Sequence, residues 1–113
     1  MISDIVTALA ALNIPIAVGI YKKTDSTPYP DKYIVITPLE ERNDDIADDR
    51  ELTETSVADV NLYCRGDYQT TKNSMKTSLK SAGFFIEDRR YLMYEADTEH
   101  HHYVFTIELK EVL

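Results

Sequence analysis

Apolar residues recur along the chain at strand spacing in some segments and at helix spacing in others. The clearest unit runs from Glu54 to Gly83 and has the pattern of a strand, a tight turn and an amphipathic helix. Apolar and polar positions alternate in its first part, which is typical of a half-buried strand. We expect its inner face to hold Ala58, Val60, Leu62 and Cys64 and its outer face to hold Asp59, Asn61, Tyr63 and Arg65.

Gly66 and Asp67 mark the passage from this strand into the helix. Glycine permits a tight backbone turn, and an aspartate side chain caps the first N–H groups of a helix. The apolar stripe then consists of Tyr68, Met75, Leu79 and Ala82. Gly83 follows as a C-terminal stop signal, so the sequence predicts a helix over 68–82.

The N-terminal residues carry a second helical pattern. Ser3 is placed to cap this helix, and apolar residues recur at helical spacing as far as Leu12. Asn13 tolerates the left-handed conformation that ends many helices, and Pro15 prevents continuation. We expect a helix over about residues 3–12.

The remaining strands are predicted over residues 14–21, 33–39, 84–95 and 103–110. The second of these is apolar on both faces and should lie centrally. It should end near Pro38, because proline has no amide donor for the sheet. In the segment 84–95, the charged residues 88–90 predict a break, and a turn is expected at 97–99.

The element order is therefore helix, three strands, helix, two strands. We expect hairpins to pair the second strand with the third, and the fourth with the fifth. Both helices would cover one face of a mixed, mainly antiparallel sheet of about five strands, which is an α+β fold. At 113 residues the chain is expected to form a single domain.

The acidic composition narrows the range of partners. The formal net charge is −8, so the chain lacks the overall basic footprint of a nucleic-acid binder, and anionic membranes would repel it. No segment reaches the roughly 18–20 apolar residues of a membrane span. The N-terminus has no basic start and matches an amphipathic helix better than a signal peptide. These features predict a cytoplasmic protein with no membrane partner.

Charge is concentrated in two segments. Residues 40–51 hold many more acidic than basic side chains and form either a solvated loop or the tip of a long hairpin. Their like charge should keep this segment mobile until a partner orders it. The second helix carries a basic ridge of three lysines four residues apart, namely Lys72, Lys76 and Lys80. This ridge is either a solvated face or a contact with an acidic patch on another subunit.

Few residues in the chain could carry chemistry. His100, His101 and His102 are consecutive, and neighbouring residues of a strand point to opposite faces. Three adjacent histidines therefore do not converge on one metal ion, and a solvated turn or an interface is favoured. The single cysteine, Cys64, shares an apolar face and is expected to be a buried, inert thiol.

Other motifs point to assembly rather than catalysis. The three glycines are too far apart for a phosphate loop, and the acidic run lacks the glycine and the spacing of a calcium loop. Eight tyrosines exceed what one small core needs, and tyrosine is favoured where a surface is half-buried against a partner. We expect no enzymatic activity, no cofactor and no metal.

The order of segments resembles a family, the small tail-completion (head–tail joining, tail-terminator-like) proteins of tailed bacteriophages and prophages. The similar segments are LNIPIAVGIY, PDKYIVITPLEE, VNLYCRGDY, KNSMKTSLKSAGF and YLMYEADTEHHHYVFTIEL. The resemblance spans nearly the whole chain, although the triple histidine and the strongly acidic run are not required by the family pattern. It implies a virion structural protein that forms a ring, commonly of six subunits, between the head connector and the tail tube.

The resemblance also implies partners and a location. The partners are further copies of the chain, the tail-tube protein and head-connector proteins, while DNA passes through an acidic lumen that repels phosphate. The protein would reside in the host bacterial cytoplasm during assembly and afterwards in the virion. The candidate subunit-interface residues are Asp44, Asp45, Asp48, Asp49, Tyr63, Arg65, Lys72, Lys76, Lys80, Arg89 and Arg90. Residues expected to face the acidic loop of a neighbouring subunit are the ridge Lys72, Lys76 and Lys80 together with Arg89 and Arg90.

An alternative function belongs to another class. The chain could be a small cytoplasmic enzyme, or a ligand- or metal-binding α+β domain, that uses the Glu99–His102 cluster together with Asp97. A pocket lined by Glu99, His100 and His102 would favour this alternative. A flat or protruding surface at these residues would favour assembly.

Overall fold

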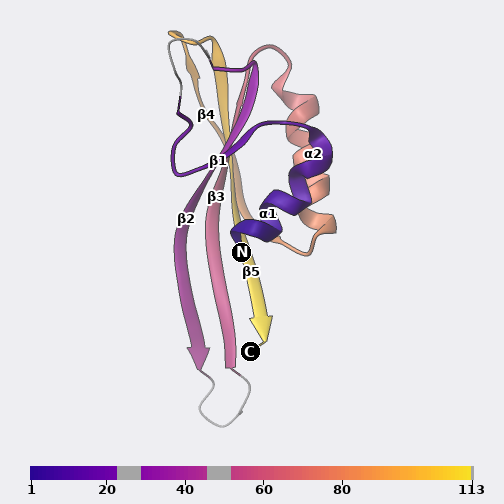
Figure 1. Ribbon diagram of the computed structural model, residues 1–113, viewed down its shortest axis with the longest axis vertical. Coiled ribbons are helices and arrows are strands. Elements are labelled where there is room, and N and C mark those ends of the chain that lie inside the picture. The colour runs from indigo at the N-terminus through magenta and orange to yellow at the C-terminus, as the bar shows by residue number, and fades with distance from the viewer. Residues whose placement is uncertain (23–28, 46–51, 113) are drawn as a thin grey trace.

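The computed structural model describes residues 1–22, 29–45 and 52–112, with the backbone alone at 43–45, 52 and 112 (Figure 1). The elements are helix α1 (Ile2–Leu9) with a 3-10 turn (Ala10–Leu12), strands β1 (Ile16–Val18), β2 (Lys32–Asp45) and β3 (Leu52–Cys64), helix α2 (Tyr68–Ser81), and strands β4 (Phe85–Glu95) and β5 (His100–Val112). The five strands form one mixed sheet in the order β1-β2-β3-β5-β4. The predicted α+β class and element order are confirmed.

Strand β3 lies at the centre of the sheet. It pairs antiparallel with β2 from Cys64 to Leu52 and antiparallel with β5 along almost the same length. Strand β4 pairs antiparallel with β5, and β1 pairs parallel with β2. Both predicted hairpin pairings are therefore confirmed. Of the two interpretations of the acidic segment, the long hairpin places residues 40–45 in a strand, and the structure has them in β2. Residues 46–51 of that segment lie outside the described residues.

Both helices pack on the same face of the sheet, here called the helix face (Figure 1). The predicted inner residues of β3 are completely buried against this layer, together with Met75 and Leu79 of α2. Ile5 and Leu9 of α1 complete the contact. Burying a large apolar side chain contributes about 1.5–3 kcal/mol, so this layer supplies the main stabilisation of the fold.

Helix α2 begins and ends at the predicted signals. The Asp67 carboxylate accepts hydrogen bonds from the backbone N–H of Gln69 (3.0 Å) and Thr70 (3.4 Å). Gly83 has a φ of 93°, a conformation that side-chain-bearing residues rarely adopt. Ala82 is exposed rather than part of the apolar stripe, because the helix has ended at Ser81.

The N-terminal prediction needs two corrections. Helix α1 starts at Ile2 with Met1 as its N-cap, so Ser3 lies inside the first turn and does not cap it. Asn13 adopts the predicted left-handed conformation, with a φ of 55°. Strand β1 is shorter than predicted because Gly19, with a φ of 81°, turns the chain away and leaves Ile20 67 % exposed.

Strand β2 continues past Pro38, contrary to the prediction that it would end there. Two features make the proline tolerable. The partner strand β1 pairs only with Ile34–Ile36, and the register with β3 shifts between Pro38 and Glu40, which leaves Leu39 as an extra residue. Proline is accepted at such edges and bulges because few ladder hydrogen bonds are lost there.

Strand β4 is continuous, and the predicted break at 88–90 is wrong. Its pairing with β5 shifts register twice, once at Glu87 and once at Leu92. Each bulge inserts one residue and reverses which face the following side chains occupy. This is why the apolar alternation of β4 looks interrupted in the sequence.

The sheet is longer than the helical layer that covers it. The molecule measures 55 × 27 × 25 Å, and the far ends of β2, β3 and β5 extend beyond both helices (Figure 1). We call this extension, residues 40–45, 52–57 and 108–112, the arm. No helix in the described part of the chain is long and apolar enough to span a membrane.

Candidate functional site

A row of stacked rings crosses the sheet on the face that the helices leave open. Tyr33 of β2 and Tyr63 of β3 are direct cross-strand partners, with ring centroids 4.6 Å apart and planes 6° apart. Tyr63 stacks in turn on His102 of β5 at 4.2 Å. Such pairs gain about 0.5–1.5 kcal/mol beyond burial of their area, so the row is a rigid surface.

The row continues onto the segments that flank β2. The Tyr29 ring stacks on Tyr33 at 5.3 Å, and the Tyr21 ring lies 4.9 Å from Tyr33. We call Tyr21, Tyr29, Tyr33, Tyr63 and His102 the aromatic row. The sequence predicted half-buried tyrosines but not their alignment, because alignment depends on the cross-strand register.

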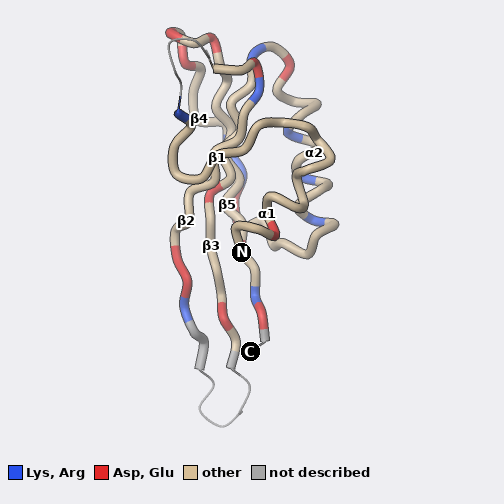
Figure 2. Tube along the Cα trace, viewed as in Figure 1, with Lys and Arg blue, Asp and Glu red and all other residues tan. Residues whose placement is uncertain are grey.

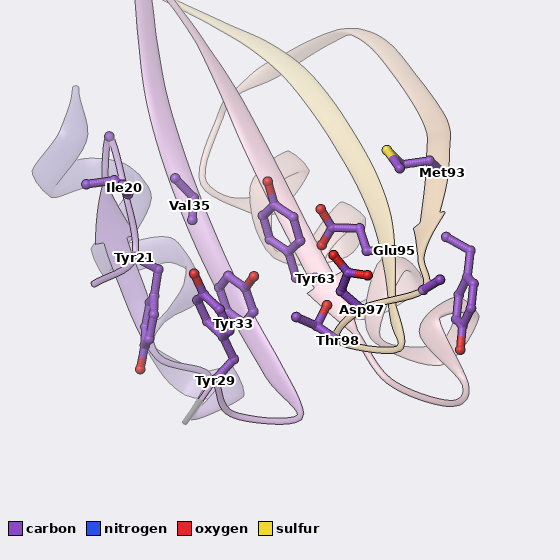
Figure 3. Close-up of a pocket in the computed structure, with 13 residues that line it drawn as sticks. Ile20, Tyr21, Tyr29, Tyr33, Val35, Tyr63, Met93, Glu95, Asp97 and Thr98 are labelled. Carbon is purple, nitrogen blue, oxygen red and sulfur yellow. The ribbon is translucent and has the colours of Figure 1, made fainter. Parts of the chain in front are cut away.

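A groove of about 590 Å³ runs beside the aromatic row on the open face (Figure 3). Tyr33, Val35 and Tyr63 lie on its sheet side. One wall is formed by residues 19–21, which follow β1, and the other by residues 93–98 at the end of β4 and in the next turn. The groove is thus built by segments that are distant in the sequence.

Two carboxylates enter this groove, those of Glu95 and Asp97 (Figure 3). Burial is the main cause of a raised pKa at both Tyr33 and Tyr63, and the negative charge of Glu95 is the second cause. The phenols therefore stay protonated at neutral pH and offer hydroxyl groups rather than phenolates. In the groove, Glu95 and Asp97 supply the negative charge, while the rings of Tyr33 and Tyr63 are neutral.

Arg65, a predicted interface residue, closes one end of the open face. Its Nε donates a 2.7 Å hydrogen bond to the Thr98 carbonyl, and its Nη1 lies 3.0 Å from Asp31 Oδ1. The same Nη1 donates to the Tyr29 carbonyl at 3.5 Å. Arg65 thus fastens the segment 29–31 to the turn 96–99 within one chain, and it stabilises the groove from the side.

The three histidines point to alternating faces, as predicted. His100 is fully buried, and its Nε2 donates to the Pro30 carbonyl at 2.8 Å, because a carbonyl oxygen can only accept. His102 Nε2 lies 2.9 Å from Asn61 Oδ1, and burial lowers the pKa of His102. His101 lies on the helix face, where its Nδ1 is 3.0 Å from the Tyr91 hydroxyl.

The alternative function, an enzyme or a ligand- or metal-binding domain, would use the Glu99–His102 cluster. Within the ranges that the structure describes, no three His, Cys, Asp or Glu side chains are grouped to hold a metal ion. The lining of the groove, over the same residues, excludes Glu99, His100 and His102. This groove is therefore not the pocket that the alternative function would require at Glu99–His102.

Cys64 is buried, as predicted. Its Sγ lies 3.4 Å from the Arg65 carbonyl and 3.7 Å from the Asp67 carbonyl, to which the thiol can donate. Burial raises the pKa of this thiol, which disfavours the thiolate needed for nucleophilic chemistry. The side chain packs in the core between the sheet and α2.

The predicted basic ridge gains a fourth member from β4. Lys72 lies 5.3 Å from the centre of the Tyr103 ring, and Arg89 is the main cause of a lowered pKa at Lys76. We call Lys72, Lys76, Lys80 and Arg89 the basic patch. Helix α2 contains no acidic residue, and Figure 2 shows its basic residues on the helix face.

The other charged interface candidates lie elsewhere. Arg90 is on the open face and pairs with Asp88 at 2.6 Å. Asp44 and Asp45 belong to the arm, while Asp48 and Asp49 lie outside the described residues. In Figure 2 the acidic residues described on the arm lie apart from the basic residues of α2.

Exposed apolar side chains gather at the two outer edges of the sheet, a feature that sequence reasoning missed. On β4 they are Phe85, Tyr91, Leu92, Met93 and Tyr94, all 41–65 % exposed. Along the opposite edge they are Val18, Ile20 and Leu39, which are 51–67 % exposed. Sequence periodicity could not find them, because the bulges and the short β1 decide which residues face outward.

Comparison with known proteins gives no family assignment for this chain. A scan against known protein families finds no match, and a search of curated proteins finds no relative. The function is therefore argued from the geometry of the open face, the sheet edges and the charged surfaces.

Proposed function

We propose that this chain is a ring-forming structural subunit of a tailed phage or prophage, which caps or joins the tail tube at the head–tail interface. The observation that carries the proposal is the pair of exposed apolar edges. The β4 edge and the β1–β2 edge lie on opposite sides of one sheet and differ in sequence and shape. Exposed apolar patches of this kind mark interaction surfaces.

Two different complementary edges favour a head-to-tail contact between copies. In such a contact the β4 edge of one subunit packs against the β1–β2 edge of the next. Heterologous contacts of this type close into a ring when the rotation between copies divides a full turn. A ring in which every subunit is equivalent leaves no apolar edge exposed.

Charge separation supports the same arrangement. The basic patch lies on the helix face, whereas the arm carries acidic residues that include Glu40, Glu41 and Glu111. We infer that the patch of one subunit contacts the acidic arm of its neighbour, including Asp44 and Asp45. A ring of copies that each carry −8 would otherwise repel itself, so such contacts offset part of the repulsion.

The remaining negative charge suits a channel for nucleic acid. Phosphate binding requires lysine and arginine directed at the backbone, whereas Arg90 is ion-paired and the basic patch lies on the helix face. An acidic lumen allows DNA to pass without sticking. No specific DNA contact, metal or catalysis belongs to this proposal.

The oligomeric state tests the proposal. Sedimentation analysis and electron microscopy of the purified protein, alone and with isolated tail tubes, should reveal rings, and Leu92→Glu should prevent them. The matched control is Val6→Glu, because Val6 is also an exposed apolar residue but lies on α1, away from both edges. A protein that stays monomeric under all these conditions, and never decorates tube ends, would contradict the proposal.

A further inference from the structure

We propose that the groove on the open face binds an arginine side chain presented by an extended segment of a partner protein. The charge of the groove, the chemistry of its walls and its shape favour this ligand. The groove is built within one copy, and its walls include Ile20 and Met93, which also belong to the two apolar edges.

The groove has acidic charge that no lining residue neutralises. Glu95 and Asp97 line it, and none of the residues described along it is a lysine or an arginine. Arg65, which bonds to the carbonyl of the lining residue Thr98, is already paired with Asp31. A planar guanidinium matches a carboxylate with two parallel hydrogen bonds, which makes arginine the best-fitting cation.

The walls suit the flat, weakly hydrated guanidinium plane. Tyr33 and Tyr63 are stacked face to face, so they are held rigid where they line the groove. The groove offers the Glu95 and Asp97 carboxylates as acceptors. An arginine has five N–H donors to distribute over such acceptors.

The shape of the groove favours a side chain carried on an extended segment. Its volume of about 590 Å³ exceeds one side chain, and exposed Ile20 and Met93 lie on its two walls. These apolar walls can contact the flanking residues of the segment. A residue pattern of apolar, arginine, apolar is therefore the expected sequence of the partner.

The occupant is assigned to a different protein for two reasons. Arg42, Arg65 and Arg90 of this chain are already in internal ion pairs. Lys72, Lys76 and Lys80 of the basic patch project from helix α2 rather than from an extended segment, and Arg89 of β4 lies beside them on the helix face. A second copy remains testable as the competing occupant.

Titration with two short peptides tests the proposal. One carries a central arginine between apolar residues, and its twin carries citrulline, which has the same shape without the charge. Calorimetry and NMR on the free, wild-type protein should show that the arginine peptide binds at least tenfold more tightly. The resonances of Tyr33, Tyr63 and the turn 96–98 should shift on binding.

Matched variants identify the site. Glu95→Gln with Asp97→Asn should weaken arginine-peptide binding at least tenfold, while Glu99→Gln, an acidic neighbour outside the groove lining, should leave it unchanged. Thermal unfolding confirms that each variant is folded. Equal affinity for the citrulline peptide, or unchanged binding by the Glu95/Asp97 variant, would overturn the proposal.

Competition separates the two occupants. If the groove takes a partner segment, the arginine peptide leaves the sedimentation of the protein unchanged at concentrations where copies associate. The alternative result is that the peptide dissociates these assemblies and the Glu95/Asp97 variant is monomeric. In that case the groove binds a second copy and the partner proposal is wrong. Failure of ring formation by itself leaves the peptide result unaffected, so the two proposals fail separately.

Discussion

Tyr33 and Tyr63 stack face to face across β2 and β3, with centroids 4.6 Å apart and planes 6° apart. This pair forms the middle of the aromatic row and one side of the groove. Because each ring lies between two others, removing one takes a ring contact from both of its neighbours.

Replacing Tyr63 with alanine should therefore destabilise the fold. We expect a loss of roughly 1–3 kcal/mol in the free energy of unfolding, since a half-buried aromatic side chain and two stacking contacts disappear. Tyr63→Phe keeps the ring and should remain close to wild type. Urea unfolding of both variants measures the difference, and equal stability of the two would refute the stabilising role of the row.

Protonation of His102 should lower stability in mildly acidic solution. Burial lowers the pKa of this histidine below its ordinary value of 6.5, so the unfolded chain takes up a proton more readily than the folded one. The free energy of unfolding should then decrease as the pH falls below about 6.5 and should be independent of this group above it.

The variant His102→Phe isolates this effect. It preserves stacking on Tyr63 but removes the titrating group, so its stability should depend less on pH between about 6.5 and 5. Urea midpoints measured across this range for both proteins provide the comparison. An identical pH profile for the two proteins would show that His102 does not contribute.

The thiol of Cys64 should react slowly while the protein is folded. Its side chain is fully buried and its pKa is raised by that burial, so both access and thiolate concentration are low. A chromogenic disulfide reagent at pH 7.5 should label the unfolded protein in urea at least a hundredfold faster than the native protein. Comparable rates would indicate that the core opens readily around β3.

Reversing charge on the basic patch should weaken assembly selectively. Lys76→Glu with Lys80→Glu removes two cations and adds two anions on α2, which opposes the contact proposed with the neighbour's acidic arm. Sedimentation should show association at least tenfold weaker at low salt, with the difference diminishing at high salt. Lys110→Glu, on the arm itself, is the control and should have a smaller effect. Unchanged association by the double variant would exclude the patch from the interface.

The helix face was predictable from the sequence because its signals are local. The alternation through Ala58, Val60 and Leu62 identifies a buried strand face, and Asp67 and Gly83 fix the ends of α2. Each signal depends on a residue and its close neighbours in sequence. Tertiary structure agreed with these local preferences, and the predicted layer of helices on one sheet face followed.

The groove could not be predicted in the same way. It requires Tyr33 and Tyr63 in register, the chain reversal at Gly19 and the placement of Glu95 by a bulge at Leu92. A single-residue change in register would send these side chains to the other face. The abundance of tyrosine was visible in the sequence, but the site it builds depends on pairing between distant segments.

The two bulges of β4 have a further consequence for how copies of this chain meet. Strand β4 is a long edge with five exposed apolar side chains, the kind of edge on which uncontrolled cross-β growth begins. The extra residues at Glu87 and Leu92 interrupt the regular spacing of its outward N–H and C=O groups, so a foreign strand cannot pair along its full length. Contact through side chains remains open, which permits a finite, reversible assembly while disfavouring fibrils.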